Sequence, residues 1–119
     1  PLATAAGLAA LSLLDAAAYE QLEATARRLE VGLQSVLPAA QVTRAHTLVG
    51  LFFAGAPVRN YEDARAADHL RYAQLFHGLL ERGVYFAPSG YETLFPSLAH
   101  TDADIDRTIE AAAEAANVT

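Results

Sequence analysis

Three side chains near the C-terminal end of the chain have the residue types of a hydrolytic triad. Ser89, His100 and Asp102 offer a nucleophile, a general base and a carboxylate to orient that base. The sequence around Ser89 reads APSGYE and lacks the G-x-S-x-G turn that exposes a nucleophilic serine. Asp102 is better explained by the start of a helix, because Thr101 and Asp104 have the spacing of a capping box with Asp in place of Glu. We therefore predict that these residues form no triad.

Glu92 is the acidic residue whose surroundings are most suggestive of a site. It lies in the segment SGYETLF, which is rich in turn-forming and aromatic residues. A carboxylate there would attract an amine or another cationic ligand, although a solvated loop charge explains the same pattern. The nearby aromatic residues alternate with small ones, which fits a pocket lining and equally a covered strand: Tyr85, Phe86, Tyr91 and Phe95.

Other kinds of site are excluded by residue type or by spacing. The four histidines have no partner histidine three or four positions away on a predicted helix, so we expect no metal site: His46, His69, His77 and His100. No G-x-G-x-x-G or Walker loop is present. The chain has no Cys, which excludes disulfides and thiolate zinc sites. All eight basic residues are arginines, so no lysine can form a Schiff base.

Composition sets the class of protein. With 119 residues the chain is one domain at most, and its 53% hydrophobic content predicts an ordered core. The net charge is −6 and no basic cluster occurs, which excludes nucleic-acid partners. No stretch of eighteen apolar residues is present, so we expect no membrane span. The start lacks the basic region of a signal peptide, and the lack of Cys fits a reducing compartment. We expect a cytoplasmic protein.

Two helices are predicted at the N-terminal end. Pro1–Leu14 is an Ala/Leu run with apolar side chains all round the helical wheel, so we expect it to be buried or packed on another domain. Asp15 is the predicted N-cap of a second helix that runs to about Leu37, where Pro38 stops it. The apolar stripe of this second helix has steps of three and four: Tyr19, Leu22, Ala26, Leu29, Leu33 and Val36.

The strand signals all lie after Pro38. Gln41–Ala45 alternates weakly, and the apolar run Leu48–Phe53 predicts a central strand covered on both faces. Val58–Ala67 predicts a loop with one helical turn. Two shorter strands are predicted at Val84–Phe86 and at Thr93–Leu98, the second confined to an edge or bulge by its proline.

Two further helices complete the expected fold. Asp68–Arg82 is predicted to be helical with Gly83 as its C-cap. Its expected inward residues are Leu70, Ala73, Phe76, Leu79 and Leu80. The closing helix starts at the capping box, and its expected inward residues are Ile105, Ile109, Ala112 and Ala116.

The predicted fold class is α+β, with a small mixed or antiparallel sheet, helices packed on one side of it, and a long apolar helix in front. Residues 1–37 are expected to form connecting helices, and residues 38–119 a small α+β domain. Met is absent, including at position 1, so we expect this chain to be one piece of a longer protein.

The order of several short segments resembles the C-terminal segment of the glutamate-1-semialdehyde 2,1-aminomutase family. In family order these are PLATAAGLAALSLLD at 1–15, NYEDA at 60–64, RY, FH and LL within 71–80, RGVY at 82–85, APS at 87–89, Glu92, and AHT at 99–101. Each segment is weak alone, but their shared order and spacing carry the resemblance across nearly the whole chain. The chain departs from the family pattern at His46-Thr47-Leu48, at Tyr91 and at Pro96.

The resemblance implies the small C-terminal domain of a fold-type-I enzyme of the class III aminotransferases. The parent enzyme would use pyridoxal phosphate and its pyridoxamine form to make 5-aminolevulinate for tetrapyrroles. By the same resemblance the Schiff-base lysine lies upstream of Pro1. This chain alone should therefore hold no catalytic residue, bind no cofactor and be inactive.

The resemblance also implies a substrate-binding role for Glu92, which matches an acidic residue near the family's substrate and cofactor. Ser89 is the second candidate for substrate binding. The expected partners are the remainder of the parent enzyme and a second copy in a homodimer. Two alternatives stay open: another class III aminotransferase acting on a different amine, and a non-catalytic domain that binds a partner through its apolar first helix.

Overall fold

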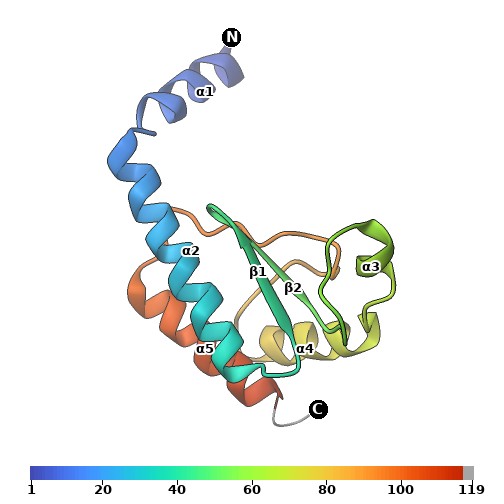
Figure 1. Ribbon diagram of the computed structural model, residues 1–119. Coiled ribbons are helices and arrows are strands. Elements are labelled where there is room, and N and C mark those ends of the chain that lie inside the picture. Colours follow the sequence, from blue (N-terminus) through green and yellow to red (C-terminus); the bar gives the residue numbers. More distant parts are fainter. Residues whose placement is uncertain (117–119) are drawn as a thin grey trace.

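A computed structural model describes residues 1–116 of the chain (Figure 1). The described residues form helices and one antiparallel hairpin, in the order α1 Leu2–Ser12, α2 Ala16–Val36, β1 Gln41–Ala45, β2 Leu48–Phe52, α3 Tyr61–Arg65, α4 His69–Glu81 and α5 Asp102–Ala116. The predicted α+β class with an antiparallel sheet is confirmed. The last three residues of the predicted C-terminal domain lie outside the described part of the chain.

The predicted apolar helix is present as α1, but nothing in residues 1–116 covers it. It projects from the end of α2, away from the body of the domain (Figure 1), and none of its residues is buried. Leu2, Leu8 and Leu11 are between 65% and 86% exposed. Within residues 1–116, no single helix is long and apolar enough to cross a membrane, and α1 and α2 satisfy length and composition only together, as a pair bent by 82°.

Helix α2 starts and packs as its sequence predicts. The Asp15 side chain accepts a hydrogen bond of 2.9 Å from the Ala18 N–H, which satisfies a free donor of the first turn. The middle of the predicted stripe, Ala26, Leu29 and Leu33, is buried in the main core. Helix α2 therefore contributes to the same core as the residues that follow it.

The two strands form a tight hairpin in which Ala45 pairs with Leu48. His46, in the turn, has φ 54°, a left-handed conformation that costs energy for a residue with a Cβ. Its Nδ1 lies 2.9 Å from a carboxylate oxygen of Glu23 on α2, which holds the turn. That hydrogen bond lowers the pKa of Glu23 below its usual range.

Strand β2 was predicted to be covered on both faces, but in the structure only one face is buried. Its residues alternate, so that Val49 and Leu51 are buried while Leu48 is 39% exposed. The hairpin is the whole regular sheet among residues 1–116. One face of β2 therefore meets the core, and the other is covered only in part.

The two short C-terminal strands were predicted wrongly. Neither segment is a regular strand, and in them only Leu94 pairs, through main-chain bonds of 3.1 and 2.8 Å with Val49. Pro96 supplies no N–H to continue that ladder. At the other segment, the Val84 N–H closes the end of α4 by donating to Leu79 O at 2.9 Å, with Gly83 at φ 78° in the left-handed cap position.

Helix α4 lies where it was predicted, between the caps Asp68 and Arg82, but it is rotated from the expected face. Tyr72, Leu75 and Leu79 are its buried residues, whereas Leu70 and Leu80 are 72% and 45% exposed. Apolar residues occupy two faces of this helix, and packing against α5 and the segment after α4 selects one of them. Periodicity alone does not decide between two apolar faces.

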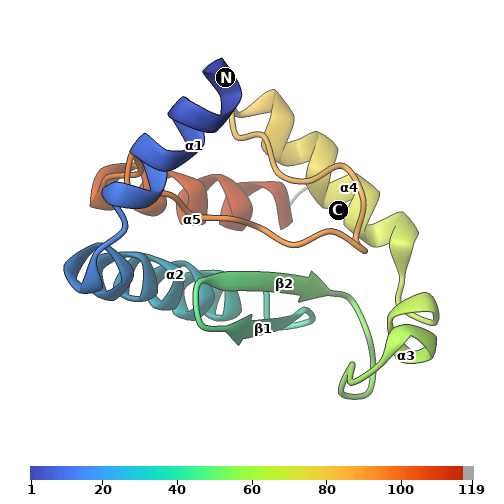
Figure 2. The same cartoon turned by 90° about the horizontal axis from the view of Figure 1, so that it is seen from above.

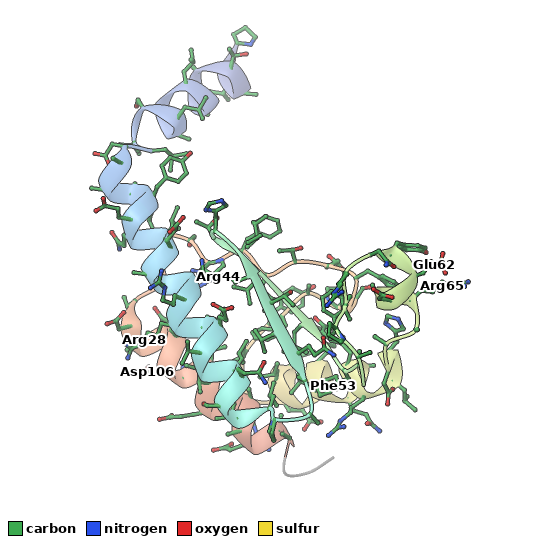
Figure 3. All side chains as sticks on the ribbon, in the orientation of Figure 1. Arg28, Arg44, Phe53, Glu62, Arg65 and Asp106 are labelled. Atoms are coloured by element: carbon green, nitrogen blue, oxygen red, sulfur yellow. The ribbon has the colours of Figure 1, made fainter. Side chains whose placement is uncertain are left out.

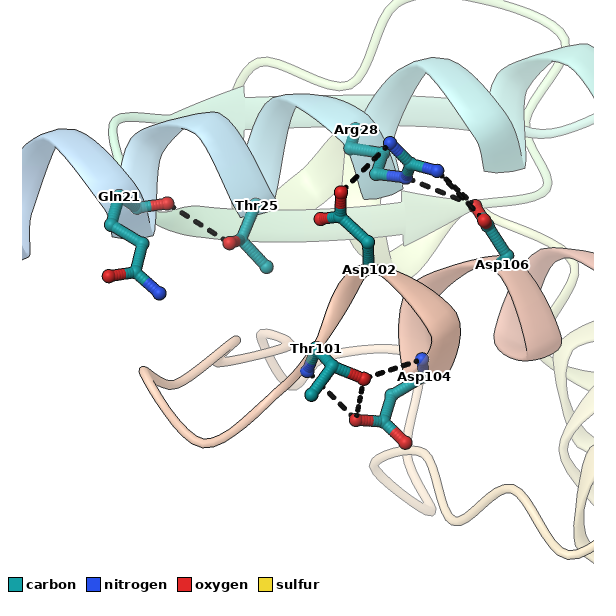
Figure 4. Close-up of polar contacts among 7 residues, drawn as sticks. All are labelled: Gln21, Thr25, Arg28, Thr101, Asp102, Asp104 and Asp106. Carbon is teal, nitrogen blue, oxygen red and sulfur yellow. Dashed lines mark hydrogen bonds and ion pairs between the residues drawn. The ribbon is translucent and has the colours of Figure 1, made fainter.

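Helix α5 begins with the predicted capping box and packs against both α2 and α4 (Figures 2 and 4). The Thr101 N–H donates to Asp104 at 2.8 Å, and the Asp104 N–H donates to the Thr101 hydroxyl at 3.2 Å. The Thr101 hydroxyl bond is the largest cause of the lowered pKa of Asp104. Of the predicted inward residues, Ile105 and Ala112 are buried and Ile109 is half-buried.

An exposed ion pair joins α2 to α5 (Figures 3 and 4). The Arg28 guanidinium donates to both carboxylate oxygens of Asp106 at 2.7 and 2.8 Å, and lies 3.5 Å from Asp102. The bond to Asp106 raises the pKa of Arg28 above its ordinary value. The pair adds little stability, since exposed pairs are screened by water.

Candidate substrate-binding turn

The structure brings the two predicted site residues together in one turn. The Glu92 N–H donates to the main-chain oxygen of Ser89 at 3.0 Å, which closes the turn. The Ser89 hydroxyl accepts a longer bond of 3.3 Å from the Tyr91 N–H. Ser89 is half-buried and committed to shaping the turn, whereas the side chain of Glu92 is exposed. Glu92 is thus the member of the pair that is available to a ligand.

The turn is anchored at both of its ends. On the N-terminal side, the Tyr72 hydroxyl of α4 donates to Ala87 O at 2.8 Å. On the C-terminal side, Leu94 pairs with Val49 of β2. Between them Gly90 is buried, and a Cβ there would lie 3.2 Å from Cγ of Tyr72. A turn held in this way presents Glu92 in a defined place.

Tyr72 is kept as a neutral donor by its surroundings. Burial raises its pKa to about 12, and the nearby Glu92 carboxylate adds a smaller push in the same direction. A negative charge disfavours formation of a second one close by. The hydrogen bond from Tyr72 to Ala87 is therefore present throughout the neutral pH range.

The Glu92 carboxylate forms no ion pair with residues 1–116. Other carboxylates of the chain are paired, such as Glu30, which lies 2.7 Å from Arg44, and Glu114, which lies 3.0 Å from Arg82. An exposed, unpaired carboxylate on an anchored turn is suited to bind a cation that comes from outside this part of the chain.

The aromatic residues near the turn serve two different purposes. Phe86 is 7% exposed and belongs to the core, whereas Tyr85 and Phe95 are 73% and 69% exposed. All three line a groove of about 390 Å³ between the segment after α4, the segment around Leu94 and the first half of α5. The expected pocket lining is thus found for these three, while Tyr91 and Glu92 lie outside the groove.

Ser89, His100 and Asp102 each have other hydrogen-bond or ion-pair partners among residues 1–116. His100 Nδ1 accepts a bond of 2.9 Å from the Ser97 N–H, and Asp102 lies beside Arg28. Ser89 shapes the turn described above. Residues 1–116 contain no group of three or more His, Cys, Asp or Glu side chains able to hold a metal ion.

Sequence reasoning missed the residues of α4 that contact the turn. His69 stacks on Tyr91 with ring centroids 4.5 Å apart, and Tyr72 bonds Ala87. Neither contact has a short-range signal, because each joins residues from separate elements. The rotated face of α4 explains part of this, since Tyr72 was not among its predicted inward residues.

No protein-family model matches the chain. Solved structures match its fold: a glutamate-1-semialdehyde aminomutase from Pseudomonas aeruginosa in complex with PMP has a TM-score of 0.77 at 25% identity, covering 87% of this chain and 24% of its own. A β-phenylalanine aminotransferase from Variovorax paradoxus has a TM-score of 0.63 at 36% identity, covering 82% and 22%. The architecture is that of the C-terminal region of class III aminotransferases.

Sequence relatives narrow the class. A glutamate-1-semialdehyde 2,1-aminomutase from Thermus thermophilus is 45% identical over 122 residues, which covers 97% of this chain and 28% of the relative. The aminomutase of an Anaeromyxobacter species is 44% identical over 126 residues, which covers 99% and 29%. The chain is homologous to the C-terminal portion of glutamate-1-semialdehyde 2,1-aminomutase. It spans a little over a quarter of the length of these curated relatives.

Proposed function

We propose that this chain is the C-terminal part of a pyridoxal-phosphate-dependent glutamate-1-semialdehyde 2,1-aminomutase. Such an enzyme is an isomerase that moves an amino group from C2 to C1 of its substrate and so makes 5-aminolevulinate for tetrapyrroles. The observation that carries the proposal is 45% identity to an aminomutase across nearly the whole chain. The chain has just over a quarter of that relative's length, so turnover belongs to the longer protein.

Within that protein, the role of this chain is to present Glu92 to the ammonium group of the substrate. A carboxylate attracts an ammonium, whereas an arginine in its place would repel one. Glu92 is exposed and unpaired among residues 1–116, and its turn is anchored to α4 and β2. Ser89 contributes by closing that turn, which makes its contribution to substrate binding indirect.

The cofactor does not fit this chain alone. Pyridoxal phosphate supplies reversible amino-group transfer when it is held as a Schiff base by a lysine. The sequence contains no lysine. A related aminomutase structure holds PMP, and the Schiff-base lysine that the present protein would need is not among these 119 positions. The chain borders the substrate site without supplying the cofactor site.

The partners of this chain would be the rest of the parent protein and a second copy in a homodimer. Exposed leucines in α1 and at its C-cap support association with such partners: Leu2, Leu8, Leu11 and Leu13. Burying such side chains is worth roughly 25 cal/mol per Å² of apolar surface. The net charge of −6 and the lack of Cys support a cytoplasmic protein without nucleic-acid or membrane partners.

A second candidate is a class III aminotransferase that acts on a different amine. The observation in its favour is the β-phenylalanine aminotransferase, which is 36% identical, against 25% for the aminomutase of known structure. The two candidates differ in the need for an external amino acceptor, because an aminomutase returns the amino group to the same molecule.

The deciding experiment is an assay of the full-length parent with glutamate 1-semialdehyde as its sole substrate. We expect 5-aminolevulinate without an added amino acceptor. Turnover of another amine that strictly requires a keto acceptor would instead establish the second candidate. The 119-residue chain is assayed beside it, treated with pyridoxal phosphate and borohydride. We expect no reduced adduct on any side chain after peptide mapping that excludes the N-terminal amine.

A further inference from the structure

The neighbour of Glu92 makes the ring contacts of the turn. The Tyr91 ring stacks on the His69 ring with centroids 4.5 Å apart and planes 24° apart. The same Tyr91 ring stacks on Tyr61 of α3 at 6.0 Å. Because Glu92 follows Tyr91 directly, holding this ring restricts the main chain from which the Glu92 side chain starts.

His69 acts on the turn through its ring rather than through a hydrogen bond. Its Nε2 atom is buried and has no hydrogen-bond partner among residues 1–116. Its Nδ1 atom lies where a Cβ on Gly90 would be 3.4 Å away, so the imidazole packs against two successive residues of the turn, Gly90 and Tyr91. A phenyl ring can supply this contact, and a methyl group is too small to do so.

Between the anchors at Ala87 and Leu94, ring contacts hold the tip of the turn: Gly90 packs on Tyr72 and His69, and Tyr91 stacks on His69 and Tyr61. The hydrogen bonds of Ser89 shape the tip internally, but they do not tie it to another element. Stacked rings favour one relative placement beyond the effect of the area that they bury. That preference selects one placement of a short turn from several.

We propose that His69 is a positioning residue for the Glu92 carboxylate: its ring holds Tyr91 and thereby sets where Glu92 meets the substrate ammonium. The inference rests on the proposed function, in which Glu92 binds that ammonium. A misplacement of about 1 Å in a substrate-positioning group costs roughly a hundredfold in rate. His69 thus affects turnover without contacting the substrate.

The test uses the full-length parent protein carrying His69→Ala, His69→Phe, Glu92→Gln or the double variant His69→Ala/Glu92→Gln. Hydrogen exchange of the peptide spanning residues 87–94 reports the order of the turn, independently of activity. We expect His69→Ala to exchange faster there and to lose about ten- to a hundredfold in kcat/KM. His69→Phe should restore both. In the Glu92→Gln background, His69→Ala should cost no further activity, since the two act as one unit.

A matched control is His77→Ala, which removes an exposed imidazole further along the same helix, where it contacts Phe76. It should leave both measurements unchanged. If His69→Ala does not fold, Tyr91→Leu removes the other ring of the stack from a position that is 47% exposed and should give the same results.

Three outcomes overturn the proposal. The first is unchanged exchange of the 87–94 peptide in His69→Ala or Tyr91→Leu. The second is that His69→Ala lowers activity by the same factor in wild type and in Glu92→Gln, which would mean that His69 acts through another group. The third is a Glu92→Gln variant as active as wild type, which overturns the role of Glu92 in the proposed function itself. If Glu92→Gln is impaired but the turn is undisturbed in His69→Ala, only the inference about His69 is overturned and the proposed function stands.

Discussion

The Tyr72 hydroxyl donates a hydrogen bond of 2.8 Å to the main-chain oxygen of Ala87, and so joins α4 to the turn that carries Glu92. Tyr72→Phe keeps the buried ring and removes only this bond. We expect a loss of about 0.5–1.5 kcal/mol in the free energy of unfolding. Urea unfolding measures it, with Tyr61→Phe, at a position 67% exposed, as the matched control. Equal stability of both variants and wild type would contradict the role of this bond.

The same tyrosine gives the domain a specific pH dependence. Burial raises the pKa of Tyr72 to about 12, whereas an unfolded tyrosine titrates near pH 10. The folded state therefore holds a proton that the unfolded state has lost, and stability falls as pH rises from about 10 to about 12. We expect this extra slope in unfolding measurements on wild type and its absence in Tyr72→Phe. A slope that is the same in both proteins would assign it to other groups.

The features predicted correctly from the sequence are those that depend on residues close together in the chain. Asp15 caps α2, and Thr101 and Asp104 cap α5, because each bond lies within one turn of its helix. The face of α4 and the missing ladders at Val84 and Thr93 were not predictable in this way. Packing against distant segments determines which of the two apolar faces of α4 is buried. The Val84 N–H donates to Leu79 O at the end of α4, so it is not available to a strand ladder.

In the candidate site, too, contacts between residues close in sequence were predicted and contacts between distant residues were not. Ser89 and Glu92 were predicted together because they belong to one short turn, which the hydrogen bond from the Glu92 N–H to Ser89 O closes. His69 and Tyr72, which hold the turn, come from a helix that is separated from it in sequence. Whether Glu92 meets the substrate stays a prediction, because its partner would come from outside the chain.

The buried face of α4 is tested by a pair of leucines. The sequence pattern predicted that both would face inward, but Leu79 is completely buried whereas Leu70 is 72% exposed. Leu79→Ala should lower the free energy of unfolding by about 2–5 kcal/mol, because it removes packed atoms and leaves a cavity. Leu70→Ala should change it by less than about 0.5 kcal/mol. Thermal or urea unfolding of both variants checks this, and similar losses in the two would mean that the helix is rotated.

Close packing of α4 on α5 sets the cost of a small substitution. A Cβ on Gly78 would lie 2.8 Å from Cβ and 3.4 Å from Cα of Ala115. Gly78→Ala should destabilise the domain, since overpacking costs about 1–3 kcal/mol and outweighs the roughly 1 kcal/mol gained in helix propensity. Gly32→Ala should cost less in urea unfolding, because its obstacle is the Ile109 side chain, which can change rotamer. The opposite ranking would show that Ile109 is the more rigid neighbour.

Helix α1 should make the isolated chain associate. None of its residues is buried among residues 1–116, and Leu2 is 86% exposed. Apolar burial of roughly 25 cal/mol per Å² favours covering such a helix with a second copy when the parent's other domain is missing. Sedimentation should show a dimer or larger species for the full 119-residue chain and less association for a chain that starts at Asp15. A clean monomer of the longer chain at high concentration would contradict this.

The role of Glu92 is tested in the full-length parent by Glu92→Gln, which removes the negative charge and keeps the shape of the side chain. A hydrogen bond to a charged group is worth about 1.5–3 kcal/mol, so we expect kcat/KM to fall by about ten- to a hundredfold if the contact forms mainly in the transition state. Stability should change by less than about 0.5 kcal/mol, since the side chain is exposed and unpaired within residues 1–116.

Steady-state kinetics and a thermal melt of the same Glu92→Gln sample separate these two effects. Glu110→Gln is the matched control, because it removes one exposed carboxylate from α5 at a distance in sequence from the turn. It should leave both the kinetics and the melt unchanged. A Glu92→Gln enzyme with wild-type kinetics would make Glu92 an ordinary solvated loop charge. A variant that melts early would make it a structural residue of the turn, because the loss of activity would then follow from the loss of folded protein.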